Sequence, residues 1–232
     1  MKAFVLAASL LLPATGMMAR TAQERLRDAT DTFNEIMATP DKGIPQDLLA
    51  KAQCVVIIPG AKKAAFLVGG EYGRGFAVCR RQSGTGWGAP GAVRMEGASV
   101  GFQIGGSSTD LVLLVMNKDG MEKLLRDKFK LGADASVAAG PVGRTASAET
   151  DAMMHAEILA WSRSRGLFGG VSVAGSTLRN DLDENEALYG RKLDNREVVM
   201  TGIARPPAAE ELIHALDRYS EFKEGSSADR AK

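Results

Sequence analysis

The chain has 232 residues, of which 45% are hydrophobic and 25% are charged, and its formal net charge is +1. This length and composition suffice for one well-buried core and predict a single domain. A net charge so close to zero excludes a molecule that is attracted as a whole to nucleic acid or to an anionic bilayer, so any such attraction has to come from a local group of cations.

The first residues predict an export signal. Lys2 precedes the apolar run 3–12, and Pro13 and small residues follow, which is the order of a secretory signal over residues 1–19. The apolar run is roughly half as long as a membrane-spanning helix, so a permanent anchor is not expected. We therefore expect an exported protein, periplasmic or secreted, that is soluble or peripheral on a membrane.

The next segment predicts two helices. Thr21 and Glu24 have capping-box spacing, and apolar residues then recur every three or four positions, which predicts an amphipathic helix that ends before Pro40. Pro45 opens a shorter helix that ends near Ala52. The polar face of the first helix carries more acidic than basic residues, whereas a membrane-surface helix normally carries Lys and Arg there. Packing on the core is the favoured interpretation of this helix.

A sheet is predicted from residue 54 onward. Pro59 and Gly60 are expected to end its first strand, and residues 70–73 are expected to join the next two. Between Gly60 and Gly106 lie 13 of the 26 glycines, a density that indicates bends and bulges in a sharply curved sheet. The last of these strands is an unbroken apolar run that suits burial on both faces. The predicted strands are 54–58, 64–69, 75–80 and 109–116.

The second half of the chain adds both kinds of element. We predict helices over 120–130, 184–188 and 212–222, and strands near 135–142, 152–161, 167–174 and 197–200. The predicted fold class is therefore α+β, with one curved, glycine-rich, mainly antiparallel sheet packed by N- and C-terminal helices. The domain is expected over 20–224, followed by a flexible tail over 225–232.

Four stretches carry the signature of a family. They are CVVIIPGAKKAAFLVGGEYGRG from Cys54, GFQIGGSSTDLVLLVMN from Gly101, KFKLGADASVAAGPVGR from Lys128 and SRSRGLFGGVSVAGSTLRND from Ser162. In this order, and from about Ala22 to Gly202, the chain resembles the SYLF domain family in a secreted form. The resemblance implies phospholipid binding, best attested for phosphoinositides in eukaryotic members, and binding to filamentous actin in fungal ones. It implies neither catalysis nor a cofactor.

The predicted lipid-binding residues lie in two cationic turns and at one strand end. Guanidinium groups bind phosphate oxygens in a bidentate manner, and an apolar pair beside them can enter the acyl boundary of a bilayer. The strand end contributes only if it faces the same way as the turns. Solvated turns without a ligand are the competing interpretation, and both stay open at this point. The residues are Lys62 and Lys63, Arg163 and Arg165 with Leu167 and Phe168, and Arg80 and Arg81.

A hydrolase is disfavoured by the sequence context. Residues 97–101 match the G-x-S-x-G pattern around Ser99, but a strand-like piece follows instead of the helix that a nucleophile elbow requires. His155 and His214 also lack a recognisable triad pattern around them. Ser99 is therefore interpreted as a residue of the sheet.

The two sequence patterns that could bind a metal ion are also incomplete. Asp181 begins a run that resembles a calcium loop, but the sixth and twelfth positions are Glu186 and Lys192, which leaves at most a weak surface cation site. Cys54 and Cys79 do not have zinc-ligand spacing. Whether they form a disulfide stays open, because a bridge depends on the distance between their Cα atoms.

The predicted partner is the surface of an anionic phospholipid membrane, and no nucleic acid is expected. The alternative is a protein-interaction or scaffold module in the exported compartment, with an unidentified protein partner. Actin is not expected as that partner, because the protein is predicted to leave the cytoplasm.

Overall fold

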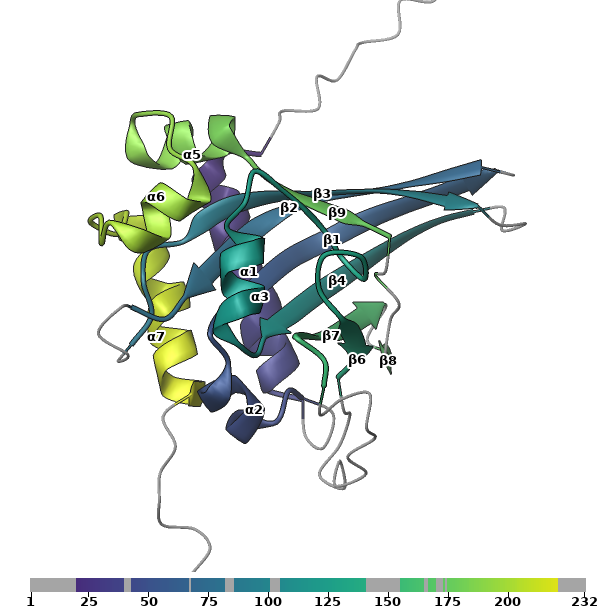
Figure 1. Ribbon diagram of the computed structural model, residues 1–232, viewed down its shortest axis with the longest axis horizontal. Coiled ribbons are helices and arrows are strands. Elements are labelled where there is room, and N and C mark those ends of the chain that lie inside the picture. Colours follow the sequence, from purple (N-terminus) through teal and green to yellow (C-terminus); the bar gives the residue numbers. More distant parts are fainter. Residues whose placement is uncertain are drawn as a thin grey trace, which may run out of the picture.

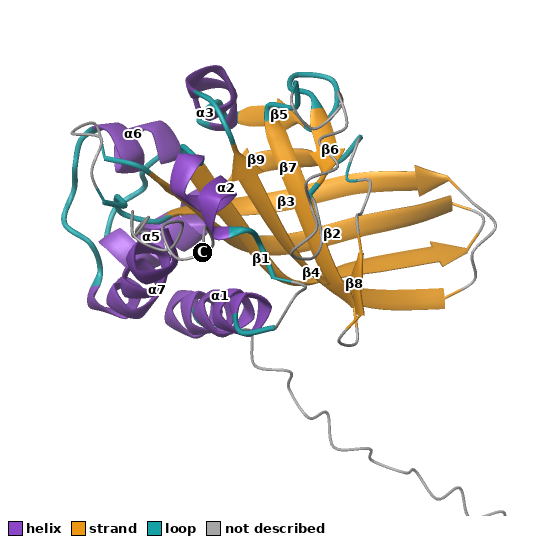
Figure 2. Cartoon of the chain, turned by 90° about the horizontal axis from the view of Figure 1, so that it is seen from below, coloured by secondary structure: helices purple, strands orange, loops and turns teal. Residues whose placement is uncertain are grey.

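The computed structural model describes residues 20–39, 43–66, 68–81, 86–100, 105–140, 155–164, 167–169, 173 and 175–220. The predicted export signal and the C-terminal tail lie outside these residues. The architecture is α+β, with one nine-stranded sheet. Most helices gather at one end of the sheet, and the long strands of the sheet extend beyond them as an arm (Figure 1, Figure 2). The predicted fold class is confirmed.

The sheet has the strand order β5-β9-β3-β2-β1-β4-β7-β6, and β8 pairs with β7. Neighbouring strands are antiparallel except β6 and β7, which are parallel. The strands are β1 (Cys54–Phe66), β2 (Val68–Cys79), β3 (Gly91–Val100), β4 (Gly105–Val115), β5 (Lys128–Lys130), β6 (Val137–Ala139), β7 (Ile158–Ser164), β8 (Leu167–Gly169) and β9 (Thr177–Asn180).

The predicted helices at both ends of the domain are confirmed. In the capping box of α1, Thr21 Oγ1 accepts from the backbone N–H of Glu24 at 3.2 Å, and the Glu24 carboxylate accepts from the N–H of Thr21 at 2.7 Å. The apolar stripe of α1 lies on the core, with Leu26 and Phe33 fully buried. The helices are α1 (Ala22–Met37), α2 (Gln46–Lys51), α3 (Lys118–Leu124), α5 (Leu182–Tyr189), α6 (Asn195–Met200) and α7 (Glu210–Ser220), with a 3-10 turn, η1, at Pro207–Ala209.

The helical end of the sheet is buried on both faces. On one face, called here the α1 face, Val55 and Ile57 of β1 pack with α1, α2 and α7. On the other, the α3 face, Val56 and Ile58 pack with α3 and with Phe129 of β5. Strand β4 alternates in the same way, so the prediction of two-sided burial over residues 109–116 is confirmed.

Pro59 and Gly60 do not end the first strand, because the sheet absorbs them as a bulge. The pairing of β1 with β4 shifts between Ile58 and Ala61, and β1 then continues to Phe66. Gly60 has a φ of 55°, and its N–H donates to Asp110 Oδ1 at 2.8 Å. The bulge therefore takes the place of the predicted turn.

Residues 70–73 likewise lie inside one strand, β2, instead of joining two. The nearby Gly75 is required by close packing, since a Cβ atom there would lie 1.9 Å from the carbonyl oxygen of Ile57. These glycines therefore serve bends and close backbone contacts within long strands, as the prediction of a curved sheet assumed.

Three other segments differ from the prediction. Residues 197–200 form the end of α6, because the side chain of Asp194 caps the helix by accepting from the N–H of Glu197 at 2.7 Å. The helix that begins at Lys118 ends at Leu124, and residues 128–130 form strand β5. Strands β3 and β9 were not predicted as separate elements, although Ser99 does lie in the sheet as expected.

The two cysteines form a disulfide. Cys54 and Cys79 are directly opposite on β1 and β2, with their Cα atoms 3.9 Å apart and their sulfur atoms 2.06 Å apart. Both are fully buried on the α3 face. The structure thus decides a question that the sequence left open.

Reduction of this disulfide is expected to lower the free energy of unfolding. The bridge closes a loop of 25 residues, for which the lost constraint on the unfolded chain is worth about 3 kcal/mol. Guanidinium unfolding of oxidised and fully reduced protein, with thiol counting to verify the reduction, measures the difference. A Cys54→Ala/Cys79→Ala variant should not respond to reductant, and equal midpoints for oxidised and reduced wild type would contradict the prediction.

Candidate anion-binding face of the sheet

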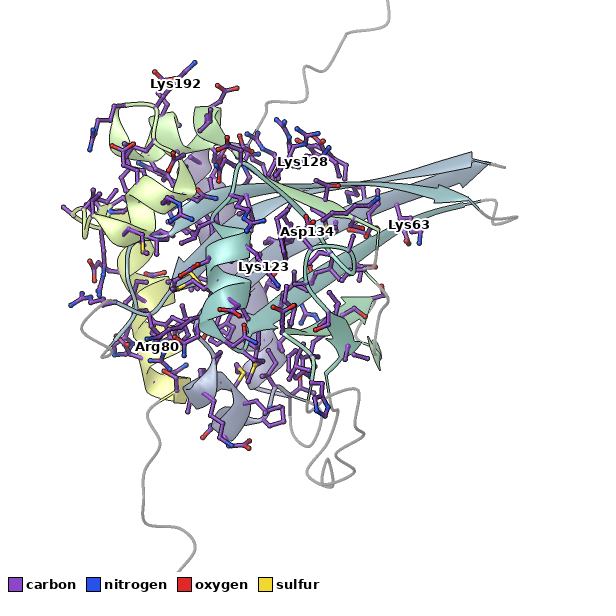
Figure 3. The ribbon with its side chains drawn as sticks, in the orientation of Figure 1. Lys63, Arg80, Lys123, Lys128, Asp134 and Lys192 are labelled. Carbon is purple, nitrogen blue, oxygen red and sulfur yellow. A yellow bond between two sulfur atoms is a disulfide. The ribbon has the colours of Figure 1, made fainter. Side chains whose placement is uncertain are left out.

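The two predicted lysines do not share a surface. Lys62 and Lys63 are neighbours on β1, so their side chains point to opposite faces of the sheet. Lys62 lies on the α1 face, where its Nζ donates to Ser108 Oγ at 3.1 Å. Lys63 is exposed on the arm (Figure 3).

Arg80 and Arg81 lie at the other end of β2. Arg80 is eight residues beyond Tyr72, the partner of Lys62, which places it about 26 Å away along the strand. Figure 3 shows it beside α7 and α2. Its guanidinium lies 3.9 Å from the ring centroid of Trp87 and donates to backbone carbonyls at the end of α2. Burial lowers the pKa of Arg80. These two arginines therefore do not extend the surface of Lys62.

Arg163 holds α1 on the sheet. Its side chain is 16% exposed and pairs with Asp110 of β4 at 2.7 Å and with Glu35 of α1 at 2.5 Å. Burial alone would lower the pKa of Arg163, but the bonds to the two carboxylates outweigh it and raise the pKa. Arg165 lies outside the described residues, and Leu167 and Phe168 belong to β8. The charge of Arg163 is thus compensated within the fold.

A row of four basic residues crosses the α1 face. The sequence analysis did not identify this row. Lys128 of β5 lies opposite Arg179 of β9, Arg179 opposite Arg94 of β3, and Arg94 opposite Arg74 of β2. The residues that alternate with them, such as Phe129, point into the core of the other face. Adjacent strands are roughly 4.8 Å apart, so the row spans about 14 Å. Like charges directly opposite one another destabilise a sheet, so this row needs anions nearby.

The acidic residues of the fold compensate the row only in part. Arg74 pairs with the buried Asp181 at 2.5 Å and with Glu184 at 3.2 Å. Arg94 and Arg179 share Glu96, at 2.7 and 3.2 Å. Both contacts are made by the buried Nε atoms of the arginines, and neither contact has the geometry of a hydrogen bond. Two guanidinium groups therefore share one carboxylate.

Lys128 has no ion pair with any described residue, and the same is true of Lys130. Both side chains are exposed at the edge of the sheet, and Figure 3 shows Lys128 beside β3 and β9. These lysines therefore add positive charge at this edge of the α1 face that no described ion pair compensates.

A second row runs parallel to the first, one step along the arm. Lys62, Tyr72, Glu96, Thr177 and Lys130 are in register across five strands. Tyr72 is 47% exposed. Among the large hydrophobic side chains of the described residues, only Tyr72 and Leu182 are exposed. We call the two rows the cationic face, with basic members Arg74, Arg94, Arg179, Lys128, Lys62 and Lys130.

A small cleft forms the border between the cationic face and α1. Its volume is about 160 Å³, and it is lined by Arg20, Arg25 and Asp28 of the α1 region, Pro59, Gly60 and Lys62 of β1, and Tyr72, Gly73 and Arg74 of β2. Arg25 is anchored to Glu184 by two hydrogen bonds, at 2.6 and 2.9 Å. The N-terminal half of α1 thus adds guanidinium groups to one side of the face.

Other chemical sites receive no support from the described residues. Within them, no three His, Cys, Asp or Glu side chains are grouped as metal ligands. Asp181 and Glu184, which lie at the start of α5 in the run that resembles a calcium loop, form ion pairs with arginines of α1 and β2. Ser99 lies in strand β3, one residue before its end, and pairs with Gly69 of β2. The helices in the described part are all too short or too polar to cross a membrane.

Comparison with known proteins identifies the family. Residues 96–219 match the Ysc84 family, described as "Las17-binding protein actin regulator". The chain is 37% identical over 180 residues to LAS seventeen-binding protein 3 of Saccharomyces cerevisiae, which covers 76% of this chain and 39% of the yeast protein. It is 34% identical over 206 residues to human SH3 domain-containing YSC84-like protein 1, which covers 88% of this chain and 58% of the human protein.

The chain belongs to the SYLF (Ysc84) family. The resemblance drawn from the four sequence stretches is thereby confirmed. The chain spans only part of the length of these SYLF relatives, so it corresponds to one portion of them. The matched residues include Glu96, Lys128, Lys130 and Arg179, so much of the cationic face lies within the SYLF match.

Replacement of Arg163 by alanine is expected to destabilise the fold by about 2 kcal/mol, because Asp110 would be left partly buried without its cation. Urea unfolding measures the change. Arg191→Ala is the matched control, since that side chain is 62% exposed and its pairing with Glu197 is long, at 3.4 Å. The control should change stability by less than about 0.5 kcal/mol. Equal effects of the two substitutions would contradict the role assigned to Arg163.

Proposed function

We propose that this protein is a non-enzymatic module that binds anionic phospholipid head groups at a membrane surface through the cationic face. The observation that carries the proposal is the row of basic residues in register on four adjacent strands. The chain as a whole is close to neutral. The local group of basic residues on this face, and not the net charge, would therefore attract an anionic surface.

The chemistry of the face suits phosphate esters. Each basic residue near an anionic leaflet contributes about 1 kcal/mol, so several acting together give weak, salt-dependent attachment. The guanidinium groups of the arginines add donors that match phosphate oxygens in a bidentate manner. Tyr72 supplies an amphipathic ring of the type found at membrane interfaces.

The β7–β8 turn is a second proposed contact. Arg165, Leu167 and Phe168 keep the combination of a guanidinium group and an apolar pair, whereas Arg163 is occupied by Asp110 and Glu35. Phe168→Ala together with Arg165→Gln tests this turn separately from the cationic face. We also propose that the protein acts after export, on the basis of residues 1–19.

Protein binding is the second candidate function. It is favoured by the description of the family and by the name of the yeast relative, both of which refer to Las17 binding. The family description also names actin regulation, which argues for actin as a partner and against our expectation. The predicted export argues for the expectation, because it would separate the protein from actin. Cosedimentation with filamentous actin, in parallel with vesicles, separates the two functions.

Neutralising three lysines of the cationic face should weaken vesicle binding on the order of a hundredfold, at about 1 kcal/mol per charge. The variant is Lys62→Gln/Lys128→Gln/Lys130→Gln, which leaves no carboxylate without its partner because none of these lysines forms an ion pair in the described structure. Cosedimentation with vesicles of phosphatidylglycerol and phosphatidylcholine, over a salt series, gives the affinities.

The matched control is Arg191→Gln/Lys192→Gln/Arg196→Gln. It removes the same charge from exposed positions outside the cationic face, two between α5 and α6 and one in α6. The control should bind as the wild type does. Equal loss in both variants would show an effect of net charge alone, and salt-insensitive binding would contradict the electrostatic proposal.

A further inference from the structure

A cavity of about 590 Å³ lies at the opposite end of the molecule from the arm, between α6, the start of α7 and the connection from β2 to β3. Its size is within the range of small-molecule sites. Arg81, Arg205 and Glu210 contribute charged side chains to its lining, and Val199, Met200 and Ile203 contribute apolar ones.

Two guanidinium groups converge in this cavity on a single oxygen atom. Arg81 Nε donates to the carbonyl oxygen of Trp87 at 3.1 Å, and Arg205 Nη2 donates to the same oxygen at 2.6 Å. A guanidinium group has five N–H donors, so this one bond uses a small part of what each arginine offers. The shared carbonyl thus holds two positive charges side by side at the wall of the cavity.

The cavity has one acidic side chain in its lining. Glu210 Oε2 lies 3.8 Å from Arg205 Nη1, and its side chain is 63% exposed, so solvent screens this pair. The positive charge of the two arginines therefore exceeds the negative charge of the lining. Such a site favours an anion, and most strongly one that both guanidinium groups can reach.

Apart from Thr201, the other residues of the lining are apolar residues and glycines. Val199 and Ala89 are largely buried, and Met200 and Ile203 are partly exposed. An occupant that carries only charge would leave this wall in contact with water. An occupant with an apolar body would cover it and gain the corresponding transfer free energy.

We propose that this cavity binds a small monocarboxylic acid with a short apolar chain. The carboxylate would lie against Arg81 and Arg205, which match its geometry in a bidentate manner, and the chain would lie against Val199 and Ile203. Arg81 is nine residues beyond Tyr72, or roughly 30 Å along β2, so this site is separate from the cationic face. The inference does not rest on the proposed membrane function.

Hexanoate is the probe, with hexan-1-ol and inorganic phosphate as comparisons. NMR titration of the full chain should show hexanoate shifting the methyl signals of Val199 and Ile203, with hexan-1-ol and phosphate binding at least about tenfold more weakly. Arg81→Gln should weaken hexanoate binding by about tenfold or more, the usual effect of losing a charge-assisted bond. Arg191→Gln, at an exposed arginine outside the cavity, should leave it unchanged.

Ala204→Trp is a second variant, which places a large side chain in the lining while keeping both arginines, and it should abolish the hexanoate shifts. If phosphate binds as tightly as hexanoate, charge alone explains the binding and the proposal is overturned. If hexan-1-ol binds as tightly as hexanoate, apolar surface alone explains it, with the same consequence. The proposal is also overturned if neither Arg81→Gln nor Ala204→Trp reduces hexanoate binding. Vesicle binding by the Arg81→Gln variant should equal that of the wild type.

Discussion

The structure depends on the burial of its central strands on both faces at one end only. In β1, alternate residues from Cys54 to Ile58 enter two separate cores, one beneath α1 and α7 and one beneath α3. Beyond the bulge at Pro59 and Gly60 the same strand continues without that cover, and Lys62 and Lys63 are exposed on opposite faces. One set of long strands therefore supplies the core at the helical end and the exposed arm at the other.

The cationic face follows from this arrangement at an energetic cost. Placing Arg74, Arg94, Arg179 and Lys128 directly opposite one another gives repulsion across three strand pairs, and Glu96 and Asp181 offset only part of it. A sheet selected for stability alone would place alternating charges at these positions. Local conflict of this kind supports the proposed function, because a bound anion would offset the repulsion.

Two ion-pair clusters tie α1 to the sheet and fix the border of this face. Near the start of the helix, Arg25 bonds Glu184, which also pairs with Arg74. Near its end, Glu35 meets Arg163. The arginines of these pairs are largely buried, and the pairs hold the amphipathic helix in a defined position over the core. Arg25 and Arg163 are thus engaged by carboxylates within the fold. Positive charge in this protein thus divides into structural arginines and surface cations.

The sequence by itself determined the family, the α+β class, both terminal helices and the two-sided burial of β4, because each is encoded by local periodicity or by continuous motifs. It did not determine that Pro59 and Gly60 form a bulge, since a turn and a bulge use the same residues. It also could not show the cationic face: Arg74 and Arg94 are 20 positions apart, and Arg179 is far beyond them. Only strand order and register bring such residues side by side, and these are decided by packing of the whole sheet.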